Sequence, residues 1–101
     1  MSDHPPLTGA QRSRLRSLGQ TMPDLIHLGR EGLTPALAAE LEALLAAREL
    51  VKLRFTGGQD RRERAALCDA IAAASRSECV GAVGHTALFY RPKAEGGQLS
   101  G

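Results

Sequence analysis

The segment Leu-Gly-Arg-Glu-Gly-Leu-Thr-Pro at residues 28–35 has the residue types and spacing that best suit ligand chemistry in this chain. Gly29 and Gly32 flank Arg30 and Glu31, and a glycine backbone reaches conformations that a side chain would obstruct. Glycines also let a second backbone come close. These residues therefore predict a loop that another polymer backbone can approach.

A predicted helix start follows this loop directly. Thr34 fits an N-cap and Pro35 fits the first helical position. The free N–H groups of such a start favour a phosphate, to which Arg30 could add a charge-assisted contact. KH domains hold single-stranded nucleic acid with a GXXG loop in this way. The alternative is a plain tight turn between a strand and a helix, and the negative charge of Glu31 counts against a phosphate site.

The net charge of the chain is only +2, so an argument for a nucleic-acid partner depends on where the charges lie. Lys52 and Arg54 share one face of a predicted strand, and covering that face with a helix would bury charge at considerable cost. The alternative for arginines on helix surfaces is that they are simply solvated. The further basic candidates lie on the first predicted helix, in a hairpin turn and after the last strand: Arg12, Arg16, His85 and Arg91.

Residues for catalysis or metal binding do not converge in the sequence. His27 lies between apolar residues of a predicted strand, and we expect a half-buried, hydrogen-bonded structural histidine. Cys68 and Cys79 are predicted to pack in the core. No CxxC or HxxxH spacing, paired carboxylates or phosphate-binding Gly-Lys-Ser/Thr motif is present. We therefore expect no catalytic residues, no metal site, no cofactor and no enzymatic activity.

Capping signals and hydrophobic periodicity predict the elements that must position these residues. Helices are expected to begin after Thr8, Thr34 and Asp60, two of them with a capping box. Four short strands are predicted at residues 24–29, 49–55, 79–84 and 86–91. The order helix-strand-helix-strand-helix-strand-strand indicates a two-layer α/β domain with a four-stranded mixed sheet.

The 101 residues suit one domain, which we place at residues 7–93. Residues 1–6 are expected to form a disordered tail and residues 94–101 a flexible one. No apolar run is long enough for a membrane span, and the amino terminus lacks the pattern of a secretory signal. We therefore expect a cytoplasmic protein with reduced cysteines and no membrane association.

Four segments together resemble the CRM domain, the chloroplast RNA splicing and ribosome maturation module, and above all its stand-alone bacterial YhbY-type form. They are LTGAQRSRLRSLG at 7–19, LIHLGREGLT at 25–34, LAAELEALLAARELVKLRF at 37–55 and VGAVGHTALFYRPK at 80–93. The resemblance implies a fold similar to the C-terminal domain of translation initiation factor three. It places the family's GxxG loop at residues 29–32 and its basic strand positions at Lys52 and Arg54. Family members often carry lysines where this chain has residues 22–24 and His85.

The resemblance also implies a partner. It predicts a non-catalytic protein that binds ribosomal RNA in large-subunit precursors and assists subunit assembly through the GxxG loop and a basic surface. The small size of the chain and the lack of a long apolar edge favour a monomer. One alternative is a protein–protein adaptor whose basic surface meets an acidic partner. A small hydrolase or transferase using His27 or His85 is a further alternative, and DNA binding is another.

Overall fold

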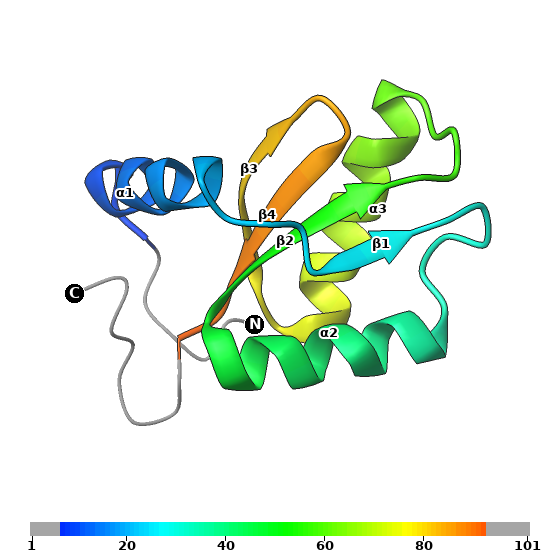
Figure 1. Cartoon of the computed structure of the whole chain (residues 1–101), viewed down its shortest axis with the longest axis horizontal. Helices are drawn as coiled ribbons and strands as arrows, with labels where there is room; N and C mark the ends of the chain where they lie inside the picture. Colours follow the sequence, from blue (N-terminus) through cyan, green and yellow to red (C-terminus); the bar gives the residue numbers. More distant parts are fainter. Residues whose placement is uncertain (1–6, 93–101) are drawn as a thin grey trace.

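The computed structural model describes residues 7–92, which form three helices and one four-stranded sheet (Figure 1). The predicted order of elements is confirmed. The elements are α1 (Gly9–Gln20), β1 (Ile26–Leu28), α2 (Pro35–Arg48), β2 (Leu50–Phe55), α3 (Arg61–Ser75), β3 (Glu78–Val83) and β4 (Thr86–Tyr90). The two predicted tails, at residues 1–6 and 94–101, lie outside the described residues. Within residues 7–92, no helix has both the length and the hydropathy that a membrane span requires.

The sheet is mixed, as predicted, with the strand order β1-β2-β4-β3. β1 runs parallel to β2, and the other neighbouring pairs are antiparallel. Leu28 pairs with Phe55 where β1 and β2 end, so the loops that follow these two strands leave the same edge of the sheet. At the other end of β2, Leu50 pairs with Tyr90. The similarity to initiation factor three stays a prediction.

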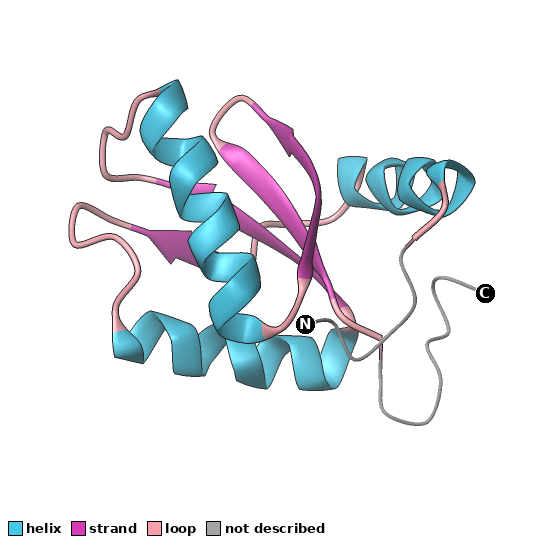
Figure 2. Cartoon of the chain, turned by 180° about the vertical axis from the view of Figure 1, so that it is seen from behind, coloured by secondary structure: helices cyan, strands magenta, loops and turns pink. Residues whose placement is uncertain are grey.

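The two faces of the sheet are covered differently. Figure 2 shows α2 and α3 lying across one face, where the main core contains Val51, Leu53 and Phe89. On the opposite face α1 covers only one part, where Leu15 packs against Leu50 and other buried residues of the sheet. The rest of this second face carries polar side chains, and we call it the open face.

Local sequence signals explain where the helices begin. The Thr8 hydroxyl accepts a hydrogen bond from Gln11 N, and Thr34 accepts one from Leu37 N. Asp60 opens α3 in the same way. These side chains satisfy N–H groups that would otherwise lack an intrahelical partner. The capping predictions are therefore confirmed for all three helices.

Candidate nucleic-acid interface

The loop at residues 29–32, which we call the first loop, is a turn that projects from the end of β1. Gly32 N donates to Gly29 O at 3.1 Å, and Gly32 has a φ of 71°, which favours glycine. Arg30 and Glu31 are exposed. Among residues 7–92, none forms a hydrogen bond or ion pair with the side chain of Arg30. The first loop therefore presents a free guanidinium group to solvent.

A second loop, at residues 56–59, holds the first loop in place. Thr56 N donates to Leu28 O at 2.8 Å, and Gln59 Nε2 donates to Gly29 O at the same distance. Gln59 Oε1 also accepts a hydrogen bond from Gly57 N at 3.1 Å. A Cβ atom on Gly57 would lie 2.5 Å from Arg30 N, so only glycine allows the two backbones to approach this closely. These contacts with the first loop were not predicted from the sequence, because they join residues that are far apart along the chain.

Two helix N-termini flank the two loops. α2 and α3 both begin at the edge of the sheet from which the loops leave (Figures 1 and 2). Arg61 and Arg62 are exposed in the first turn of α3, and Arg64 Nη1 donates to Gln59 O at 2.6 Å. The partial positive charge of helix N-termini adds to these arginines. Electrostatically, this part of the molecule is suited to a polyanion.

Two of the acidic residues at this edge, Asp60 and Glu63, cap the start of α3. Asp60 Oδ1 accepts a hydrogen bond from Glu63 N at 2.8 Å, and Glu63 Oε1 accepts one from Asp60 N at 3.0 Å. Glu31 is exposed beside Arg30 in the first loop. Because their partners are neutral N–H groups, Asp60 and Glu63 keep their negative charges, and with Glu31 they offset most of the charge of the four arginines at this edge. The edge therefore keeps only a small excess of positive charge.

His85 lies at the same edge, in the turn between β3 and β4. Its backbone oxygen accepts a hydrogen bond from Phe55 N at 2.8 Å, where β2 ends. The His85 side chain is exposed. We use the term loop edge for residues 29–32 and 56–64 together with His85.

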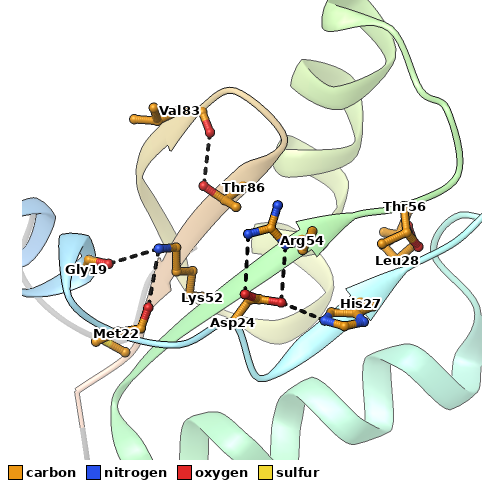
Figure 3. A network of polar contacts seen from close by, with 10 residues as sticks. All are labelled: Gly19, Met22, Asp24, His27, Leu28, Lys52, Arg54, Thr56, Val83 and Thr86. Carbon is orange, nitrogen blue, oxygen red and sulfur yellow. Dashed lines mark hydrogen bonds and ion pairs between the residues drawn. The ribbon is translucent and has the colours of Figure 1, made fainter.

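The open face adjoins the loop edge and carries Lys52 and Arg54, as the alternating pattern predicted. Lys52 is half-buried, and its Nζ donates to Gly19 O at 3.2 Å and to Met22 O at 3.3 Å (Figure 3). These oxygens lie at and just after the end of α1, where the helix dipole favours a cation. The contacts are with neutral carbonyl groups, so Lys52 keeps its net charge.

Arg54 instead meets a carboxylate. Its Nε lies 3.3 Å from Asp24 Oδ2, and His27 Nε2 lies 2.6 Å from the same oxygen (Figure 3). The hydrogen bonds from His27 and Arg54 lower the pKa of Asp24 from 3.8 to about 2. Asp24 therefore stays ionised and offsets part of the positive charge of the open face.

The prediction that His27 is half-buried is wrong, although the side chain is hydrogen-bonded. Its side chain is 58% exposed. β1 is an edge strand, and α1 packs over β2, β4 and β3 farther from β1, so no element of residues 7–92 covers His27. The ring remains available to solvent and shares Asp24 with Arg54.

Arg12 and Arg16 connect α1 to β3. Arg12 forms an ion pair with Glu78, and Arg16 Nη1 donates to Val80 O at 3.3 Å. The aliphatic part of Arg16 lies over Gly81, where a Cβ atom would come within 2.9 Å of it. The structure thus gives both arginines a role in holding α1, and places them on the α1 side of the open face.

Arg91 lies away from the other candidates. Its Nη1 contacts Glu42 Oε2 at 2.7 Å and Ser75 O at 2.9 Å. Tyr90 pairs with the first residue of β2, whereas the loop edge begins where β2 ends. At a rise of about 3.3 Å per residue, Arg91 is roughly 16 Å or more from the loop edge along the strands. The structure therefore does not bring Arg91 together with the first loop.

The two cysteines lie outside this interface. Cys68 is buried in the main core and Cys79 packs against it, as predicted. A hydrogen bond from the Cys68 thiol lowers the pKa of Cys79 to about 7, and the same contact together with burial raises the pKa of Cys68. Over the described part of the chain, His, Cys, Asp and Glu form no group of three that could hold a metal ion.

Together, the fold and the loop edge define a small α/β domain in which a GxxG loop connects β1, which is parallel to β2, to α2. Residues 7–91 match the family profile of the CRS1 / YhbY (CRM) domain. The chain therefore belongs to the CRM-domain family, and the resemblance seen in the sequence is confirmed.

Relatives match the chain over most of its length. A Pseudomonas aeruginosa protein named "Probable RNA-binding protein PA4753" is 36% identical over 85 residues, which cover 84% of this chain and 81% of that protein. A Haemophilus influenzae protein named "RNA-binding protein" is 32% identical over 89 residues, which cover 88% of this chain and 89% of the relative.

The fold also matches a solved structure. The solution structure of the hypothetical protein SAV1595 from Staphylococcus aureus superposes with a TM-score of 0.78 at 27% identity. The match covers 87% of this chain and 91% of that one. The arrangement of three helices on a four-stranded mixed sheet therefore matches that of a solved structure.

Proposed function

We propose that this chain is a non-catalytic RNA-binding protein and that RNA contacts the loop edge. The observation that carries the proposal is the exposed first loop, which presents Arg30 between the N-termini of α2 and α3 and is held by the Gln59 side chain. Loops that end at a helix N-terminus bind phosphates through backbone N–H groups. The names of two relatives, from Pseudomonas aeruginosa and Haemophilus influenzae, support RNA as the ligand.

The proposed path of the RNA continues onto the open face. Arg54 and Lys52 lie next to the loop edge, and His85 borders it. Arg12 and Arg16, which lie on α1, border this path on the side away from the loop edge. We assign Arg91 no direct contact in this arrangement, because its guanidinium group is engaged with Glu42 and lies away from the loop edge.

The RNA that we propose is ribosomal RNA in precursors of the large subunit, and the protein would assist assembly of that subunit as a cytoplasmic monomer. This finer assignment rests on the family resemblance. Crosslinking in cells followed by sequencing of the attached RNA tests it. Enrichment of large-subunit precursor RNA supports it, and an even spread over cellular RNA contradicts it.

Arg30→Ala tests the role of the loop edge, with Arg48→Ala as the matched control. Both arginines are exposed, but Arg48 lies in the last turn of α2, at the opposite end of that helix from the first loop. Loss of one phosphate contact on single-stranded RNA should reduce the log–log salt slope by about 0.7 for Arg30→Ala and leave it unchanged for Arg48→Ala. Fluorescence anisotropy over a salt series measures both slopes.

Two results contradict the proposal. One is an equal effect of the two substitutions, which would indicate general electrostatic attraction without a site. The other is a pull-down in which an acidic protein partner is retained after RNase treatment and no RNA is recovered, which would favour an adaptor.

A further inference from the structure

A groove lies between α1 and the open face, beside the path that we propose for RNA. Its volume is about 380 Å³, within the size range of small-ligand pockets. α1 forms one wall, β2 contributes Lys52, and the β3–β4 hairpin forms the other wall. The lining residues that matter here are Arg16, Gln20, Lys52, Val83, Thr86 and Leu88. We call this feature the α1 groove.

Glycines at two positions set the shape of the α1 groove. A Cβ atom on Gly19 would lie 2.2 Å from Leu88 Cδ1, so a larger residue there would force the Leu88 side chain to move. Gly81 leaves the space over which the aliphatic part of Arg16 lies. The floor of the groove, between its two walls, therefore combines backbone and apolar side-chain surface. Val83 also lines the groove and is 78% exposed. Such a surface suits a flat apolar group.

The cations of the α1 groove, like Arg30 of the first loop, are not neutralised by a carboxylate within the described chain. Arg12, Arg54 and Arg91 each meet a carboxylate. Arg16 and Lys52 donate only to neutral backbone oxygens, at 3.3 Å for Arg16 and at 3.2 and 3.3 Å for Lys52. No acidic residue lines the groove. It thus combines an apolar floor with two cations that no carboxylate neutralises.

We propose that the α1 groove binds one unpaired nucleotide of the RNA, with its base on the floor and its phosphate near Arg16 and Lys52. The side-chain amide of Gln20 would hydrogen-bond the edge of the base, since amides suit base edges and arginines can stack on bases. Among polyanions, a ligand with both a flat apolar face and an adjacent phosphate fits this combination. A base-paired nucleotide does not fit, because its base is stacked within a helix too wide for a recess between α1 and a hairpin.

This assignment rests on the proposed RNA binding and adds a preference for single strands. Lys52 belongs both to the α1 groove and to the open face. In Figure 3, Lys52, Arg54 and Thr86 lie on the same side of the sheet. An RNA strand that leaves the first loop across Arg54 would therefore reach the α1 groove next.

Gln20→Glu tests the assignment, with Ser17→Glu as the matched control. Both residues are exposed on α1 and both substitutions add one negative charge, but only Gln20 lines the α1 groove. The probes are a fluorescent single-stranded RNA of mixed sequence and a duplex of the same sequence. Gln20→Glu should weaken single-strand binding by about fivefold or more, the effect of losing one hydrogen bond of about 1 kcal/mol, and leave duplex binding close to that of Ser17→Glu.

The outcomes separate this inference from the proposed function. If Gln20→Glu and Ser17→Glu bind the single strand equally while Arg30→Ala binds it more weakly, the α1 groove takes no nucleotide and the loop edge stands. If the unmodified chain binds neither probe, the proposed function fails. Amide NMR shifts of Val83, Thr86 and Leu88 on titration with the single strand give a second readout, and the absence of shifts there overturns the inference.

Discussion

At the scale of single residues, the feature that decides where an anion can bind is the partner of each cation. Arg30 has a free guanidinium group, and Lys52 contacts neutral carbonyl oxygens. Arg54 shares the carboxylate of Asp24 with His27. The sequence shows that these residues are basic but not which of them are neutralised, because Asp24 and Arg54 meet only once β1 and β2 pair.

Asp24→Asn is expected to strengthen RNA binding a few-fold, because Arg54 and His27 would lose the carboxylate that competes with a phosphate for them. Asp69→Asn is the matched control, since it removes the same charge from the exposed side of α3, away from the open face. Isothermal titration with single-stranded RNA measures both affinities. Equal gains for the two variants would show that only net charge matters.

The carboxyl group of Asp24 should titrate with a pKa of about 2 in the folded protein, below its ordinary 3.8, because His27 and Arg54 hydrogen-bond the ionised form. A depressed pKa stabilises the fold above the ordinary value, and this contribution disappears as the pH falls through about 2. Side-chain carboxyl NMR across pH 1.5–6 measures the midpoint. A midpoint at the ordinary value would mean that the contacts with His27 and Arg54 do not persist in solution.

At the scale of elements, the two loops form one unit although 23 residues lie between Gly32 and Thr56 along the chain. Capping residues and hydrophobic periodicity predict the helices because these signals are local. The Gln59 contact with Gly29 O and the close approach of Gly57 arise only when β1 and β2 lie in parallel. The position of α1 beside the open face was not predicted for the same reason, since it depends on long-range packing such as that of Leu15.

Gln59→Ala should loosen the first loop, because Gly29 O loses a donor and Gly57 N loses an acceptor. We expect weaker RNA binding with a loss of about 1 kcal/mol in the free energy of unfolding. Gln59→Glu keeps the acceptor but not the donor, so it should weaken binding by a similar amount. Hydrogen exchange of the amides at residues 29–32 reports the loosening. Unchanged exchange together with unchanged affinity would show that Gln59 does not position the first loop.

At the scale of the whole molecule, the arrangement of charges matters more than the net charge of +2. Parallel pairing of β1 and β2 brings both loops to one edge, and the N-termini of α2 and α3 follow them there. Glu42 meets Arg91 away from that edge. The fold class and the first loop were predictable from local patterns and the resemblance. The sequence could not predict which basic residues lie at the loop edge, which lie on the open face, and that Arg91 lies away from both, because these positions depend on strand register.

Amide chemical-shift mapping during titration with a single-stranded ribosomal RNA fragment tests the central claim most directly. We predict the largest shifts at residues 29–36 and 56–62 and at His85, with smaller shifts on the open face. Residues near Glu42 and Arg91 should show little change. The largest shifts around Glu42 and Arg91, with none in the first loop, would contradict the account.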